Sequence, residues 1–207
     1  MSARPPLAAP GMRIGLLGGS FNPPHEAHRA ISLTALKRLG LDRVWWLVSP
    51  GNPLKDSTAL PSLEARVEAA RKLANHPRID VTGFSCGSAY TVDLLTALKR
   101  RFPEARFVWL MGADNLAAFD LWRDWEKIFA LVPIAVFDRP GYRLKGLASR
   151  AAQRFAPYRV DETDAGGLAS LIPPAWTLLT HPLSGLSSTA LRARAEAKKD
   201  KKKTKSH

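Results

Sequence analysis

The stretch GGSFNPPHEAH, residues 18–28, decides the fold because it joins an apolar segment to the start of a helical pattern. The apolar segment, residues 13–17, predicts a buried strand. Gly18 and Gly19 let the backbone approach a ligand closely, and Ser20 adds a hydroxyl beside backbone N–H groups. The stretch therefore predicts a strand, a glycine turn and a helix, an arrangement that binds phosphate groups at the helix N-terminus.

His25 and His28 stand three positions apart at the predicted helix start, where the helix dipole favours anions. Other phosphate or metal motifs do not fit the spacing. The histidines of a zinc protease stand four positions apart in H-E-x-x-H, and neither G-x-G-x-x-G nor a Gly-Lys-Ser/Thr loop is present. Two surface histidines in a Gly-Pro-rich loop are the alternative.

The composition favours one cytoplasmic domain. The chain has 207 residues, 45% of them hydrophobic, which is enough for one core. We expect a proline-rich disordered leader at 1–11, a domain at 12–194 and a disordered tail at 195–207. No apolar run predicts a membrane span or a signal peptide. The single cysteine, Cys86, excludes an internal disulfide and suits a reducing compartment.

The formal net charge of +13 suits anionic small substrates such as nucleoside triphosphates. Six lysines against Glu196 and Asp200 place four of these charges in the tail, and the rest are spread along the chain. Nucleic acid is disfavoured as a partner because no basic stripe is interleaved with exposed aromatic residues. Salt-sensitive polynucleotide binding through the tail stays an alternative, which deletion of residues 195–207 tests.

Short apolar runs alternate with amphipathic stretches along the chain. This alternation predicts an α/β fold, a Rossmann-like, doubly wound and mainly parallel sheet with helices on both faces. Strands are expected at 13–17, 43–49, 79–84, 106–111, 134–137 and 176–179. Helices are expected at 25–39, 62–75, 90–101, 116–119, 125–130, 147–155 and 189–197. Ligands of such sheets bind at the carboxyl ends of the strands, which is where most of the motifs lie.

Two signatures resemble those of the nucleotidylyltransferase superfamily. GGSFNPPHEAH is similar to its G-G-[ST]-F-x-P-x-H-x-G-H signature, and LSSTALR, residues 186–192, is similar to its late I-S-S-T-x-x-R signature. Between them, WWLVSPGNPLK, AYTVDLL, WLMGADNLAAFDLW and VFDRPGY resemble the bacterial nicotinate-mononucleotide adenylyltransferases, over residues 12–194. One departure is Ala27, which stands where the family has a glycine between its histidines.

The resemblance implies transfer of AMP from ATP to nicotinate mononucleotide, giving deamido-NAD and pyrophosphate in NAD biosynthesis. It implies Mg²⁺ with ATP, and we nominate no protein metal ligand, because magnesium often keeps water and substrate phosphates as ligands. A homo-oligomer is compatible with the sequence. Nicotinamide mononucleotide, phosphopantetheine or CTP as substrate are the alternatives within the superfamily.

The resemblance places ATP at both signatures. It implies His25, His28 and Arg192 as catalytic residues, with His28 nearest the transferred group, and Arg192 supplies charge to the β- and γ-phosphates. The residues expected to bind ATP are Gly18, Gly19, Ser20, Phe21, His25, His28, Ser187, Ser188, Thr189 and Arg192. Ser187, Ser188 and Thr189 are also plausible helix caps, a role that is compatible with phosphate binding.

The acceptor pocket is expected in the middle of the chain. By resemblance, Thr91 contacts the mononucleotide and Trp122 stacks on the pyridine ring. Asp114 either holds a ribose hydroxyl or caps the following helix through an Asx turn. Lys55 and Arg139 follow predicted strands, where they meet substrate charge or are solvated loop cations. The other tryptophans, including Trp125, are expected in the core.

Overall fold

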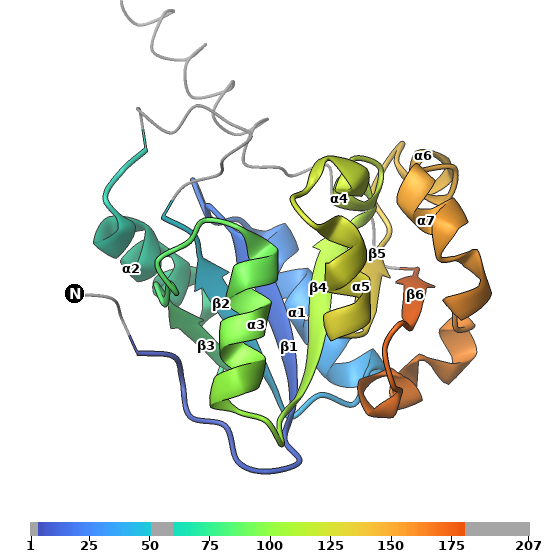
Figure 1. Cartoon of the computed structure of the whole chain (residues 1–207). Helices are drawn as coiled ribbons and strands as arrows, with labels where there is room; N and C mark the ends of the chain where they lie inside the picture. The colour runs from blue at the N-terminus through green and yellow to red at the C-terminus, as the bar shows by residue number, and fades with distance from the viewer. Residues whose placement is uncertain (1–3, 51–59, 181–207) are drawn as a thin grey trace, which may run out of the picture.

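The computed structural model describes residues 4–50 and 60–180, which form a parallel sheet covered by helices on both faces (Figure 1). The six strands lie in the order β3-β2-β1-β4-β5-β6, and every neighbouring pair is parallel. Their bounds are β1 Arg13–Gly19, β2 Arg43–Val48, β3 Ile79–Thr82, β4 Arg106–Gly112, β5 Ile134–Phe137 and β6 Trp176–Leu179. The expected doubly wound α/β fold is confirmed.

The strand order reverses next to β1. After β3 the chain crosses from one edge of the sheet to β4, which lies on the other side of β1. In open parallel sheets such a reversal leaves a crevice at the carboxyl ends of the two strands, and ligands bind there. The segments that follow β1 and β4 are therefore the first places to look for a site.

Helices cover each face of the sheet over its own core. Trp45 and Trp46 are neighbours in β2, yet they point to opposite faces, as successive strand residues do. Both side chains are 0% exposed. The face of Trp46 is covered by α1 Glu26–Arg38, α2 Leu63–Ala74 and the 3-10 helix η3 Glu162–Ser170. The face of Trp45 is covered by α3 Thr91–Arg101, α4 Ala113–Leu116, α5 Trp125–Leu131 and α7 Arg150–Arg154.

Two expected helices differ from the structure. The helix expected at 147–155 is the shorter α7, because Ser149 caps α7 by accepting from the Ala152 N–H at 3.2 Å, and a separate helix that was not expected, α6 Arg143–Leu147, precedes it. The Ser149 hydroxyl also donates to the Gly146 carbonyl, which closes the turn between them. The helix expected at 116–119 begins earlier, as α4, and η1 Phe119–Leu121 follows it. The 3-10 helix η2 Ala156–Tyr158 follows α7.

The prediction that residues 1–11 form a disordered leader is wrong for residues 4–11. Arg4 accepts a hydrogen bond from the Thr82 hydroxyl at 3.2 Å, and the Gly11 N–H donates to the Glu104 carbonyl at 3.0 Å. Ala8 packs against the core on the face of Trp45. An extended proline-rich segment needs no strand pattern to pack, so its sequence resembled that of a disordered segment. The predicted tail at 195–207 lies outside the described residues.

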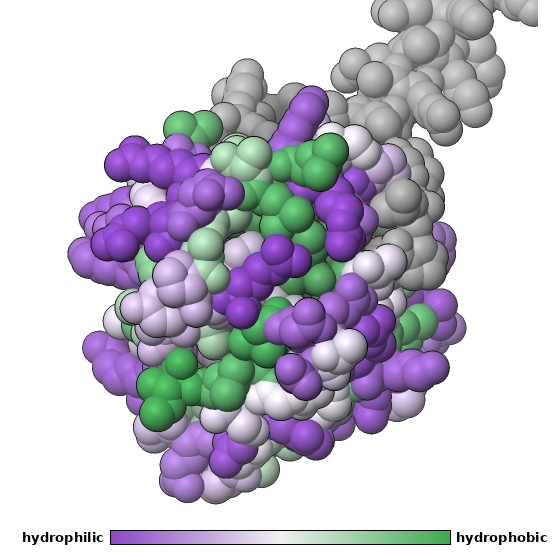
Figure 2. Space-filling view, turned by 90° about the vertical axis from the view of Figure 1, so that its right-hand side faces the viewer, coloured by the Kyte–Doolittle hydropathy of each residue, from purple (hydrophilic) through white to green (hydrophobic). Residues whose placement is uncertain are grey.

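The surface of the α6 and α7 side is mixed. Figure 2 shows hydrophobic side chains gathered between hydrophilic ones, with no continuous hydrophilic stripe across the coloured residues of this face. Leu144 in α6 is 80% exposed. Within residues 4–50 and 60–180, no helix combines the length and the apolar character that a membrane span requires.

Candidate active site

Close packing shapes the carboxyl end of β1, where Gly18 and Gly19 continue the strand rather than form the expected turn, and the residues that follow it. A Cβ added to Gly18 would collide with the ring of Trp109 from β4, so this position needs glycine. Phe21 has a φ of 47°, a left-handed conformation that costs an L-residue about 1–2 kcal/mol. Its side chain is buried and stacks on Trp46, with 5.1 Å between ring centroids. Packing of the Phe21 ring therefore holds the turn in a conformation that the backbone disfavours.

The two histidines of the motif lie against each other at the start of α1, with 3.9 Å between ring centroids. The His25 N–H donates to Nδ1 of His28 at 3.2 Å. Nδ1 of His28 also lies 3.3 Å from the His25 carbonyl oxygen, but the contact with the N–H is the shorter one, so we assign Nδ1 as the acceptor, which puts the ring proton on Nε2. His28 thus keeps an N–H donor for a group outside the protein backbone.

Both histidines are neutral at pH 7. Burial, together with the nearby positive charge of Arg139, lowers the pKa of His25 to about 4. Burial is also the main reason that the pKa of His28 falls to about 3, with smaller contributions from His25 and Arg139. A neutral imidazole donates one hydrogen bond without adding charge, so the positive charge at this site comes from arginine.

His25 is buried, with 5% of the residue exposed. Its Nδ1 atom has no hydrogen-bond partner within the described part of the chain. Because a buried polar atom normally has a partner, an unpaired one beside the turn that follows β1 suits a ligand. The position of His25 at the N-cap of α1 adds the positive end of the helix dipole.

The buried face of α1 supports this pair from below. The Ser32 hydroxyl donates to the His28 carbonyl at 2.8 Å and accepts from Nε1 of Trp46 at 2.7 Å. The Phe21 ring lies 4.7 Å from the His28 ring, centroid to centroid. Ala27, at the family's glycine position, is 4% exposed, so the structure accommodates its methyl group in the interior. His28 is therefore contacted by the His25 backbone, the Ser32 hydroxyl and the Phe21 ring.

Asp114 and Arg139 form an ion pair across the ends of β4 and β5. Arg139 Nε lies 3.2 Å from Asp114 Oδ1, and the two side chains are 18% and 32% exposed. The charge of Arg139 also acts on both histidines, as their lowered pKa values record. The structure therefore brings Asp114, Arg139, His25 and His28 together at the carboxyl edge of the sheet. Sequence reasoning named all four residues but did not pair the first two.

The residues expected at the acceptor lie on two neighbouring segments. Thr91 begins α3, and Trp122 follows η1, where its ring packs on Phe119 at 4.9 Å between centroids. The Arg123 guanidinium lies over the Tyr90 ring, 4.7 Å from its centroid, so the two segments touch. Trp125 is partly exposed and packs on Phe129 and Phe155 at the margin of the core.

Five expected site residues lie outside the described residues. These are Lys55, Ser187, Ser188, Thr189 and Arg192.

Arg66 is a residue that sequence reasoning missed. It lies in α2 and is 3% exposed, and its guanidinium donates to backbone carbonyls after β1 and after β2. In the sequence it stands among charged and small residues that predict a solvated helix face, so no local signal marks it as buried. Only the fold, which brings α2 over the ends of two strands, identifies it.

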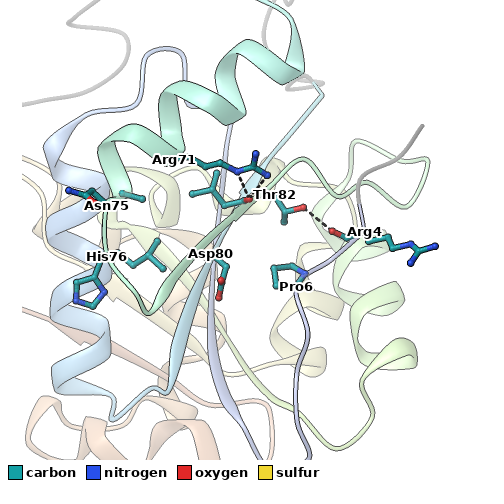
Figure 3. Close-up of a pocket in the computed structure, with 10 residues that line it drawn as sticks. Arg4, Pro6, Arg71, Asn75, His76, Asp80 and Thr82 are labelled. Atoms are coloured by element: carbon teal, nitrogen blue, oxygen red, sulfur yellow. Dashed lines mark hydrogen bonds between the residues drawn. The ribbon is translucent and has the colours of Figure 1, made fainter.

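A cavity of about 590 Å³ lies along the outer edge of β3, away from the site residues (Figure 3). None of the residues expected from the sequence to bind substrate lines it. Figure 3 shows the Arg4 side chain extending away from Thr82, which its carbonyl oxygen contacts. The cavity therefore does not gather the basic side chains around it into one binding site.

Metal ligands are not gathered either. The described residues hold no group of three or more His, Cys, Asp or Glu side chains that could bind a metal ion. The Asp114 carboxylate is engaged by Arg139. This donor set does not fit a metal ion held by the protein alone.

Comparisons with known proteins cover most of the chain. A model of the cytidylyltransferase-like family matches residues 16–194. A probable nicotinate-nucleotide adenylyltransferase of Methylorubrum extorquens is 58% identical over 185 residues, 88% of this chain and 100% of the relative. A protein of the same name from Rhizobium meliloti is 54% identical over 184 residues, 88% of this chain and 98% of that one.

A solved structure supports the fold. The nicotinic acid mononucleotide adenylyltransferase of Plasmodium falciparum, complexed with NaAD, matches with a TM-score of 0.65 and 18% identity. The match covers 88% of this chain and 83% of that chain. At this identity the likeness concerns the arrangement of helices and strands.

Proposed function

The chain belongs to the cytidylyltransferase-like family, and from this premise we propose that it is a nicotinate-mononucleotide adenylyltransferase. The reaction transfers AMP from ATP to nicotinate mononucleotide and yields deamido-NAD and pyrophosphate, a step of NAD biosynthesis. The observation that carries this proposal is the 58% identity with a relative of that name, along its whole length. The histidine pair at the β1–α1 turn supports it.

The chemistry needs positioning rather than a protein nucleophile. An oxygen of the acceptor phosphate forms a bond to the α-phosphorus of ATP, while the bond from that phosphorus to the bridging oxygen of pyrophosphate breaks. The acceptor phosphate is already ionised at neutral pH, so no strong base is required. The protein holds the two substrates in line and stabilises the charge that develops on the phosphoryl oxygens.

In this proposal the phosphates of ATP lie over the carboxyl end of β1, the turn that begins at Ser20 and the N-terminus of α1. The Nε2–H of His28 donates to the transferred phosphoryl group, and His25 donates to a neighbouring phosphate. Arg139 supplies the fixed positive charge, and its ion pair with Asp114 sets its direction. Ser187, Ser188, Thr189 and Arg192 are proposed to bind the outer phosphates.

The acceptor is proposed to lie between α3 and the segment after η1. Its pyridine ring stacks on Trp122, and Thr91, at the N-terminus of α3, contacts the mononucleotide. Asp114 and Lys55 are the other proposed contacts. Magnesium enters as the MgATP complex, with substrate phosphates and water as its ligands.

The test is formation of deamido-NAD and pyrophosphate from MgATP, with nicotinate mononucleotide, nicotinamide mononucleotide and phosphopantetheine as parallel acceptors. CTP in place of ATP is the matched control for the nucleotide. A strong preference for ATP with nicotinate mononucleotide supports the proposal. Turnover with another acceptor alone would contradict the pyridine-acid assignment, and the absence of pyrophosphate release with every acceptor would contradict the transferase.

A further inference from the structure

Arg66 is a buried cation at the floor of the proposed ATP site. It is 3% exposed, although arginine is rarely buried so fully without a partner. Its guanidinium donates to four backbone carbonyls, those of Ser20 at 2.8 Å, Ser49 at 2.7 Å, Pro50 at 3.1 Å and Pro61 at 3.0 Å. Within the described residues, no carboxylate forms an ion pair with it. All its hydrogen bonds described here therefore go to backbone oxygens.

Two of these carbonyls belong to residues that directly follow strands. Ser20 comes after β1, where the turn begins, and Ser49 comes after β2. The Ser49 N–H also donates to the Gly19 carbonyl at 2.8 Å, so the two strand ends are joined directly as well. Arg66 thus lies at the junction of α2 with the carboxyl ends of β1 and β2.

Because the peptide bond is planar, the contact of Arg66 with the Ser20 carbonyl also fixes the direction of the next N–H. In a trans peptide the C=O and the following N–H point to opposite sides. Since the Ser20 carbonyl is turned toward buried Arg66, the Phe21 N–H is turned away from it. Phe21 is the residue with a φ of 47°, so this peptide lies in a conformation that needs outside support.

We propose that Arg66 is a positioning residue for ATP: by fixing the Ser20 carbonyl, its guanidinium presents the Phe21 N–H to a phosphate oxygen. The inference rests on the proposed placement of the ATP phosphates over this turn. The positive charge of Arg66, with no carboxylate paired to it among the described residues, acts in the same sense, because it favours an anion above the turn. Burial lowers the pKa of Arg66, but an arginine side chain stays protonated.

A matched arginine on the same helix separates this role from general support. Arg71 also lies in α2 and also donates to a backbone carbonyl, that of Val81, at 3.3 and 3.4 Å from its two nitrogens. Its contact lies in β3, at the edge of the sheet rather than at the turn after β1. Substitution of Arg71 therefore removes a similar contact without touching the turn.

The first experiment compares Arg66→Lys with Arg71→Lys in the full chain. Lysine keeps the charge, but it cannot span four carbonyls with the geometry of a guanidinium. We expect Arg66→Lys to raise the KM for ATP about tenfold, with the KM for nicotinate mononucleotide changed less than about threefold. Arg71→Lys should change neither. An unchanged KM for ATP in a folded Arg66→Lys protein, or an equal rise of both KM values, would overturn the proposal.

The second experiment needs no variant. The sequence contains one Ser-Phe pair, Ser20-Phe21, so labelling serine with carbonyl ¹³C and phenylalanine with ¹⁵N isolates the Phe21 amide in one NMR signal. We expect MgATP to move this signal downfield and nicotinate mononucleotide alone to leave it in place. No movement with MgATP, in a preparation that turns over both substrates, would overturn the role of Arg66. Lack of turnover in the unaltered protein would instead contradict the proposed function.

Discussion

The N–H of His25 donates to Nδ1 of His28 at 3.2 Å, so the first histidine of the motif orients the second. With Nδ1 assigned as the acceptor of this bond, the proton of the His28 ring lies on Nε2, the ring nitrogen that does not contact the His25 backbone. The two ring centroids lie 3.9 Å apart, with the rings tilted by 32°, and both histidines are neutral at pH 7. The neutral pair can donate hydrogen bonds without carrying charge, and the positive charge that acts on both rings is that of Arg139.

Acid should destabilise the fold through this pair. Because the pKa values of His25 and His28 in the fold, about 4 and about 3, lie below the unfolded value of 6.5, the unfolded chain binds more protons below pH 6.5. The contribution of the pair is present above pH 6.5 and is lost as the pH falls toward 4 and 3. Urea unfolding should show a shallower loss of free energy from pH 6.5 to 4.5 in His28→Gln than in the unaltered chain. Parallel losses in the two proteins would contradict the lowered pKa of His28.

The carboxyl end of β1 should not tolerate a methyl group at Gly18. Gly18→Ala places a Cβ in the ring of Trp109 and should reduce the free energy of unfolding by about 1–3 kcal/mol, measured by urea titration. Gly19→Ala is the matched control, since its Cβ would meet Phe21 at an ordinary 3.5 Å. If Gly19→Ala destabilised the protein as much as Gly18→Ala, the contact with Trp109 would not be the cause.

The effects of substituting Asp114 and Arg139 on catalysis should depend on each other. Asp114→Asn frees the guanidinium from its carboxylate, and Arg139→Lys removes its planar shape. Each change should lower kcat/KM for ATP about tenfold, and the double variant should lose less than the product of the two effects. Steady-state kinetics of the unaltered protein, the two single variants and the double variant complete this double-mutant cycle. Strictly multiplicative losses would show that the two side chains act independently.

Trp122 should contribute to binding of the acceptor rather than to binding of ATP. Its ring packs at the exit of η1 against Phe119, beside the contact between Tyr90 and Arg123. Loss of one stacked ring costs about 1–3 kcal/mol, so Trp122→Ala should raise the KM for nicotinate mononucleotide roughly tenfold. Trp122→Phe, which keeps an aromatic face, should recover most of it. A rise in the KM for ATP alone would show that the ATP pocket and the acceptor pocket are assigned the wrong way round.

The sequence predicted those parts of the fold that periodicity and turn chemistry determine locally. The strands 134–137 and 176–179 match β5 and β6, and Ser62 caps α2 as expected, accepting from the Ala65 N–H. The histidine pair at the start of α1 was predicted for the same reason, since its spacing is local, whereas Gly18 and Gly19 continue β1 instead of forming the expected turn. The resemblance to a known family added the reaction.

Features that depend on distant segments could not be predicted in this way. Arg66 has the sequence surroundings of a solvated helix residue, and only the packing of α2 over two strand ends buries it. The pairing of Asp114 with Arg139 joins residues after different strands. Residues 4–11 pack through isolated contacts to Thr82 and Glu104, which leave no periodic pattern in the sequence.

The central claim is that adenylyl transfer takes place at the histidine pair, and kcat of His28→Ala with MgATP and nicotinate mononucleotide tests it most directly. Loss of one donor to the developing phosphoryl charge should lower kcat by roughly 100-fold or more, with a much smaller change in the KM of the acceptor. His28→Gln, which keeps an N–H donor, should lose less. An unchanged kcat in folded His28→Ala would contradict the account.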